Sequence, residues 1–266
     1  MFVLLNSCNL SSSQTPPLFN VNTFSGSYRD LVIAIDKEDT ASIVKLVKDE
    51  NLDVNHKDPR YGISLLRWAL ANRKYYSFQM LLDLNANPNQ TDTTKEYVPV
   101  TTIAAKIAET SSYLGLVLKH DGNPNIAASN LKKVQYTEAT PLCAAASTSL
   151  QNVKLLIENG AEIDFCPYSN FLPLTTALIA DKIGIARYLI IEKSADVHKV
   201  FTVRVNNDTA KIGEMLRLNV YPLESEEYKL KMQIVDFLKT IGIDYRNTPI
   251  PKYLYNNYSK DFLDKY

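Results

Sequence analysis

A closing motif that recurs along the chain constrains its fold more than any other feature. Each copy is an amphipathic stretch at helical spacing followed by a turn rich in Gly, Asn and Asp, as in residues 152–164. Six copies end at residues 55, 89, 125, 164, 198 and 246, so their spacings are 34, 36, 39, 34 and 48 residues. Self-similarity at a period near this length is typical of repeat architectures, in which one supersecondary unit is copied along the chain.

A second motif precedes four of these copies and predicts a shorter first helix. Its clearest form is Thr140-Pro141-Leu142-Cys143, followed by three alanines. Proline is favoured at the first helical position, because the N–H that it lacks would have no partner there. Related segments begin at Ser64, Val98 and Leu172. Each of these four copies is therefore predicted to form two helices joined by a short loop.

The two motifs together resemble the ankyrin repeat, whose signature is T-P-L-H-x-A, a second helix and a G-A-D-x-N turn. The resemblance covers roughly residues 28–246. It implies an all-α fold, an ankyrin-repeat solenoid of about six helical-hairpin repeats with an irregular C-terminal cap. We interpret residues 247–266, which start with a T-P-x segment and are rich in Tyr, Lys and Asp, as that cap or tail. A partner-binding tail is the alternative.

The departures from the ankyrin pattern predict an irregular array. In the family, the histidine of T-P-L-H joins neighbouring turns by hydrogen bonds. The corresponding residues here are Arg67, Thr101, Cys143 and Thr175. The fifth copy also carries an extra residue at Ile190-Ile191 and has Ser194 in place of the usual glycine. We therefore do not expect the inter-repeat network in its usual form.

The N-terminal segment contains Leu5-Asn6-Ser7-Cys8, which resembles a bacterial lipobox. In such a motif the cysteine is lipidated after the preceding peptide is removed. The apolar run is short and lacks a basic n-region, which a start codon placed too far downstream would explain. We predict that residues 1–27 form a truncated lipoprotein signal and a flexible tether, with lipidation at Cys8 and location in the bacterial periplasm. The alternatives are a frayed N-terminus with an incidental cysteine, and a cytoplasmic protein.

The sequence offers little support for catalysis. The three histidines, His56, His120 and His198, are separated by 64 and 78 residues, without the spacing of metal ligands. Phosphate-binding and nucleophile motifs are also missing from the sequence. Lys plus Arg and Asp plus Glu number 29 each, so no global field favours nucleic acid. We therefore predict no catalytic residue, no metal, no cofactor and no nucleic-acid partner, and conclude that the chain is not an enzyme.

The ankyrin resemblance implies that the chain binds another protein through its first helices and the loops between repeats. Sixteen tyrosines support this interpretation, because tyrosine provides contact area and a polar end at low entropic cost. The predicted partner-binding residues are aromatic or arginine side chains in or beside these loops: Arg60, Tyr61, Arg67, Trp68, Tyr97, Tyr136, Tyr168 and Phe171. For Trp68 the alternative is packing, which is more usual for an aromatic residue on a first helix.

The leading functional hypothesis is an immunity protein that binds and occludes a secreted antibacterial toxin at the cell envelope. Ankyrin-type proteins are found among the immunity partners of type VI secretion effectors, including phospholipase-type toxins, so this is an implication of the resemblance. The lipobox-like segment around Cys8 and the polar stretch after it motivate the choice. The alternative is a cytosolic ankyrin scaffold or a host-directed effector.

Overall fold

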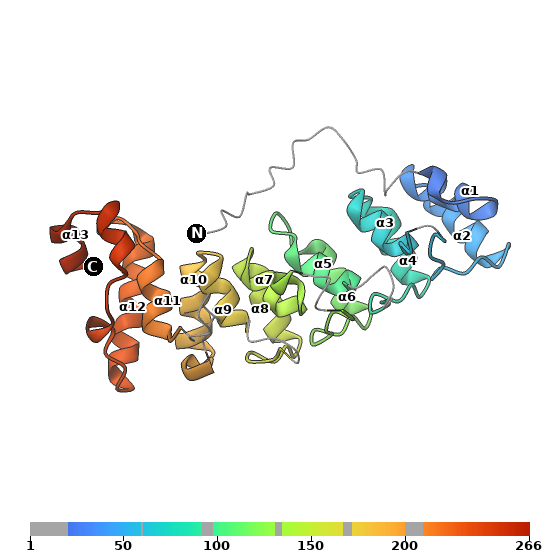
Figure 1. Cartoon of the computed structure of the whole chain (residues 1–266). Coiled ribbons are helices and arrows are strands. Elements are labelled where there is room, and N and C mark those ends of the chain that lie inside the picture. The colour runs from blue at the N-terminus through green and yellow to red at the C-terminus, as the bar shows by residue number, and fades with distance from the viewer. Residues whose placement is uncertain (1–20, 60, 92–97, 131–134, 167–171, 200–209) are drawn as a thin grey trace. The chain divides into compact units, whose positions relative to one another are not determined.

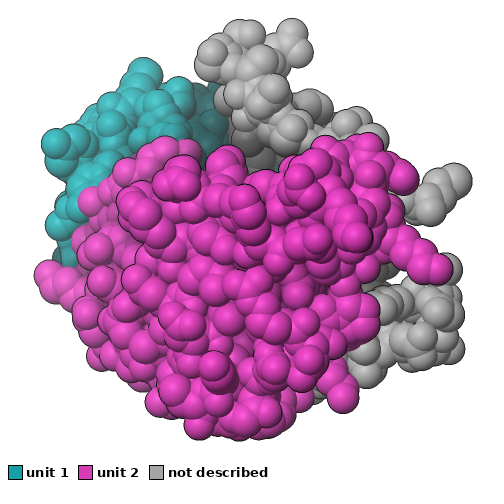
Figure 2. Space-filling view, turned by 90° about the vertical axis from the view of Figure 1, so that its left-hand side faces the viewer, with its two compact units in different colours: residues 1–86 teal, residues 87–266 magenta. Residues whose placement is uncertain are grey.

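A computed structural model describes residues 21–266 except residues 60, 92–97, 131–134, 167–171 and 200–209. The chain divides into two compact units, residues 1–86 (unit 1) and residues 87–266 (unit 2), which Figure 2 colours separately. Their described parts consist of paired helices, without a named strand. The predicted all-α hairpin architecture is confirmed.

Unit 1 contains two helical hairpins (Figure 1). A 3₁₀ helix (Val21–Thr23) precedes α1 (Ser27–Asp36) and α2 (Thr40–Lys48), and the second hairpin is α3 (Leu65–Ala71) and α4 (Tyr75–Asp83). The side chains of Asp39 and Ser64 accept hydrogen bonds from main-chain N–H groups three residues later, so they cap α2 and α3. The apolar faces of these helices form the core, with Leu31, Ile43 and Phe78 fully buried.

Unit 2 contains four hairpins and a C-terminal segment (Figure 1). The hairpins are α5 (Val100–Lys106) with α6 (Ser112–Lys119), α7 (Pro141–Ala146) with α8 (Leu150–Glu158), α9 (Pro173–Ile179) with α10 (Ile183–Arg187), and α11 (Ile212–Leu218) with α12 (Glu226–Thr240). Short 3₁₀ helices lie at Tyr136–Glu138, Val197–Lys199, Tyr245–Asn247 and Lys252–Asn256, and α13 spans Lys260–Lys265. As predicted, Thr140 caps α7 and Pro141 is its first residue.

A residue with left-handed backbone follows shortly after the end of each second helix, which makes the predicted repeat visible in the conformation. These residues are Asn51, Asn85, Asp121, Gly160, Ser194 and Gly242, with φ between 54° and 89°. Glycine adopts this region freely and other residues do so at a cost, so Ser194 is strained where Gly160 is not. In most copies an Asn or Asp then accepts a hydrogen bond from the N–H two residues later, as Asn87 does from Asn89.

The extra residue of the fifth copy is accommodated inside its second helix. This helix begins as α10 and continues as a π-helix over Tyr188–Glu192. The N–H of Lys193 donates to the carbonyl of Tyr188 at 3.2 Å, five residues back. A π turn absorbs an inserted residue without ending the helix. The turn that follows therefore keeps its register, and the N–H of Asp196 reaches the Asp164 carboxylate at 3.1 Å.

Neighbouring turns of unit 2 are joined by hydrogen bonds from the closing residue of each copy. The side chain of Asn89 accepts from the N–H of Asn123 at 2.8 Å and donates to the carbonyl of Asp121 at 2.7 Å. Asn125 makes the same pair of bonds with the next turn, at 2.8 Å and 2.9 Å. The side chains of Asn89 and Asn125 thus join the turns without the family's histidine.

Replacing Asn125 by alanine should lower the free energy of unfolding by about 1–2 kcal/mol, because two partly exposed inter-repeat hydrogen bonds are lost. Chemical denaturation followed by circular dichroism measures this change. The exposed Asn257 serves as a control, since its replacement by alanine should change stability by less than about 0.5 kcal/mol. Equal effects at the two positions would contradict a structural role for the Asn125 bonds.

The C-terminal segment packs against the sixth copy. Its side chains Leu254, Leu263 and Tyr266 are buried. At the start of the segment, a Cβ atom added to Gly213 would lie 2.4 Å from the hydroxyl oxygen of Thr248, so only glycine lets this chain approach α11 so closely. Such contacts are expected of a terminal cap, although the cap assignment stays a prediction. Tyr253 and Tyr255 remain exposed, as the alternative of a partner-binding tail requires.

Candidate functional site

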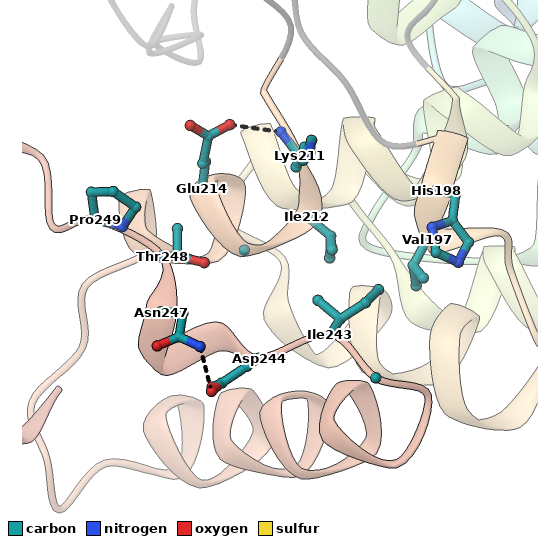
Figure 3. A pocket seen from close by; sticks show the side chains of 12 residues that line it. Val197, His198, Lys211, Ile212, Glu214, Ile243, Asp244, Asn247, Thr248 and Pro249 are labelled. Carbon is teal, nitrogen blue, oxygen red and sulfur yellow. Dashed lines mark hydrogen bonds between the residues drawn. The ribbon is translucent and has the colours of Figure 1, made fainter.

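A cleft of about 660 Å³ opens in unit 2 where the turns of the fifth and sixth copies meet the start of the C-terminal segment (Figure 3). Val197 and Ile212 are buried and Ile243 is half-buried, and Figure 3 shows their side chains turned toward the same space. We call these three residues the apolar floor. Since the floor draws on three separate segments, the cleft exists only when the fifth and sixth copies stack.

Polar side chains surround this floor. The rim carries His198, Lys211, Glu214, Asp244 and Asn247. The Glu214 carboxylate accepts from the N–H of Lys211 at 2.8 Å, which closes the first turn of α11. Asp244 accepts from the N–H of Arg246 and from the side-chain amide of Asn247, both at 2.9 Å. Local hydrogen bonds therefore hold both rim carboxylates in fixed positions.

The rim of the cleft carries charged side chains of both signs. Two carboxylates, Glu214 and Asp244, line the cleft together with Lys211 and His198. Such a rim does not concentrate charge of one sign, so it does not favour a polyanion. An apolar floor with a few oriented polar groups is instead the usual composition of a binding pocket, and the volume lies within the usual range of about 300–1,000 Å³.

The structure places Trp68 in the core of unit 1, which corrects its prediction as a partner-binding residue. Its side chain is only 1% exposed. The physical reason is that Trp68 lies among Leu65, Leu66, Ala69 and Leu70, which make nearly every face of α3 buried. Arg67 and Tyr61 are half-buried, and their roles in binding stay predictions.

Most of the other predicted site residues lie outside the part of the chain that the structure describes, so their predicted roles are not tested. Cys8, Arg60, Tyr97, Tyr168 and Phe171 lie outside the described residues, and so does the side chain of Tyr136, which opens a short 3₁₀ helix. The described members of the predicted set are not among the residues that line the cleft. The cleft was not predicted from the sequence, because the prediction of binding residues relied on aromatic side chains in or beside the loops. The available signal was the T-P-x start at Thr248 directly after the sixth closing turn.

The described part of the chain offers little else of chemical interest. Among those residues, no three His, Cys, Asp or Glu side chains are grouped so that they could hold a metal ion. Cys143 is buried and Cys166 is partly exposed. A hydrogen bond with Cys166, together with burial, raises the pKa of the Cys143 thiol well above its usual value, which disfavours a reactive thiolate. None of the described helices has the length and apolar character needed to cross a bilayer.

Comparison with solved structures identifies the fold. The human ASB11 ankyrin repeat domain matches with a TM-score of 0.55 and 16% sequence identity, over 84% of this chain and 92% of that chain. No family model matches the sequence. No curated protein matches it either. The chain therefore has the ankyrin-repeat fold.

Proposed function

We propose that this chain is a protein-binding module that holds a segment of its partner in the cleft of unit 2. The observation that carries this proposal is the apolar floor of Val197, Ile212 and Ile243 beneath a fixed polar rim. A partner side chain that enters this floor would lose its contact with water, and such desolvated anchors provide most of the binding energy in protein interfaces.

The polar rim indicates which partner residues would flank the apolar side chain bound in the floor. Glu214 and Asp244 are suited to accept hydrogen bonds, and Lys211 and His198 carry donors. A partner segment with an apolar anchor between polar or oppositely charged neighbours would satisfy both sets. Because the two signs are balanced, we expect only a modest dependence of the association rate on salt.

The proposal is tested by replacing Ile243 with aspartate. A carboxylate in the floor should weaken binding to the partner at least about tenfold, or about 1.4 kcal/mol, because it cannot be desolvated without cost. The partner is first captured from the source cells by crosslinking and mass spectrometry. Affinity is then measured with purified proteins by calorimetry.

Two variants make this test specific. Ile241 is 44% exposed and lies outside the cleft lining, so Ile241→Asp adds the same charge nearby and should leave affinity unchanged. Lys211 is exposed on the rim, so Lys211→Glu reverses a charge there without disturbing the core. Unchanged affinity for both cleft variants, with folding verified by circular dichroism, would refute this location of the binding site.

We further propose, more specifically, that the partner is a secreted antibacterial toxin and that the chain acts at the bacterial envelope. Its support is the lipobox-like sequence ending at Cys8 and the polar stretch after it, both in the undescribed N-terminal residues. Occlusion of a toxin's active site would then be the mechanism. The competing proposal is a cytosolic scaffold or a host-directed effector.

Two experiments separate these finer proposals. Metabolic labelling with a radioactive fatty acid should label the chain when it is expressed from its native locus, and Cys8→Ser should abolish the label. In cells whose growth is stopped by the toxin-like product of a neighbouring reading frame, co-expression of this chain should restore growth. Absence of the label and of protection would favour the scaffold or effector.

A further inference from the structure

Three cationic side chains and two tyrosine rings gather between the sixth copy and the C-terminal segment. Lys231 of α12 is fully buried, and Arg217 of α11 is 3% exposed. The Lys231 ammonium lies 3.5 Å from the ring centroid of Tyr266 and 5.1 Å from that of Tyr245. Arg246 lies at the edge of this cluster. Within the described residues, no Asp or Glu side chain pairs with Lys231, which instead donates to the carbonyl of Asn219 at 3.2 Å.

Tyr266 is the residue through which this cluster holds the C-terminal segment. Its hydroxyl donates to the carbonyl of Asn219. Its main-chain oxygen accepts from Arg217 at 2.6 Å and from Arg246 at 3.1 Å. Its ring stacks on Phe262 at 5.6 Å. Since the Tyr266 ring also lies on the Lys231 amine, docking of the segment is what removes this amine from water.

The surroundings disfavour the charged form of Lys231. Burial, followed by repulsion from Arg217 and Arg246, lowers the pKa of this amine to about 6. With the C-terminal segment undocked, the Lys231 amine would meet water again, and its pKa would return toward about 10.4. Undocking near neutral pH is therefore coupled to the uptake of one proton.

We propose that Lys231 is the sensing group of a pH-dependent latch, in which the C-terminal segment stays docked while the amine is neutral and undocks more readily in mild acid. The ratio of undocked to docked molecules should rise about tenfold for each unit that the pH falls from about 9 to 6. Below about pH 6 the docked state also binds the proton, so the ratio should then stop rising.

The other titratable groups that face Lys231 do not explain such a dependence. Arg217 of α11 and Arg246 of the 3₁₀ helix after α12 stay charged throughout this range. Burial raises the pKa of Tyr245 to about 12 and also raises that of Tyr266, so both phenols stay neutral when docked. The Tyr228 hydroxyl, on α12, donates to the carbonyl of Lys265. Lys231 is therefore the group that titrates differently in the two states.

The latch would also regulate the cleft. Residues 247–249, the first of the C-terminal segment, directly follow Arg246 of the cluster and line the cleft. Undocking would loosen this part of the lining, so partner affinity should fall in mild acid. That consequence rests on the proposed function, whereas the latch itself can be tested without a partner.

Hydrogen exchange of the full chain tests the latch directly. The main-chain amides of residues 262–265 are followed at about pH 6, 7.5 and 9, and the rates are corrected for the intrinsic effect of pH. The opening equilibrium should increase about a thousandfold from pH 9 to 6. In Lys231→Met, which keeps the volume without the amine, it should be independent of pH.

A matched control and a second measurement complete the test. Lys239→Met removes an exposed lysine from the same helix and should keep the wild-type dependence. Nitrogen NMR of the Lys231 amine in the wild-type protein should show titration near pH 6. A wild-type opening equilibrium that does not change with pH, a dependence that persists in Lys231→Met, or titration of the amine near pH 10 would each overturn the proposal.

Discussion

Replacing Trp68 by alanine is expected to lower the free energy of unfolding by about 3–5 kcal/mol, the range measured for large aromatic residues truncated in a packed core. The side chain is 1% exposed and lies in α3, among residues that are themselves buried. Truncation leaves a cavity in unit 1, whose described core comes mainly from two helical hairpins. Loss of cooperative folding of unit 1 is therefore the expected form of the effect.

Trp68→Phe is the matched variant for this experiment. The indole N–H has no hydrogen-bond partner among the described residues, so phenylalanine removes volume without breaking a bond. Its cost should be smaller, about 1–2 kcal/mol. Because Trp68 is the only tryptophan, unfolding must be followed by circular dichroism and not by tryptophan fluorescence. Unchanged stability of Trp68→Ala together with lost partner binding would restore the surface assignment.

The second large effect is expected at Asn152, whose replacement by leucine should destabilise the protein by about 2–4 kcal/mol. The side chain is fully buried in α8. Its amide donates to the carbonyls of Ala105 at 3.0 Å and Ile107 at 2.7 Å, at the end of α5 in the preceding copy. Leucine would leave both carbonyls buried without this donor, and an unsatisfied buried polar group carries its full desolvation penalty.

Asn159 provides the control for this prediction. It follows α8 directly and is exposed, and its side-chain amide donates to the carbonyl of Leu155 in its own helix, so Asn159→Ala should cost less than about 1 kcal/mol. Urea denaturation of both variants measures the difference. If Asn152→Leu were as stable as wild type, the inter-repeat bonds of Asn152 would not contribute to stability.

The repeat and its main irregularity could be predicted from local sequence. Turn residues such as Gly160 mark the ends of the second helices, and the Thr140-Pro141 pair marks the start of a first helix. These signals work because helix caps and left-handed residues satisfy main-chain groups within a few positions. The extra residue near Ile190 was also visible, although the sequence did not show that a π-helix would absorb it.

The candidate site could not be predicted in the same way. Its floor joins Val197, Ile212 and Ile243, which come from three segments, and no local pattern states that their side chains converge. The bridges made by Asn89 and Asn125 were missed for a similar reason, since their partners lie more than 30 residues away, at separations of 32 to 37.

By itself, the sequence of this protein determined the helical hairpins and their approximate number, because these depend on periodicity and on hydrogen bonds between near neighbours. Only the tertiary structure decided that Trp68 is core and that Lys231 is buried against Tyr266. Burial depends on what packs against a face, and residues distant in the chain supply that packing.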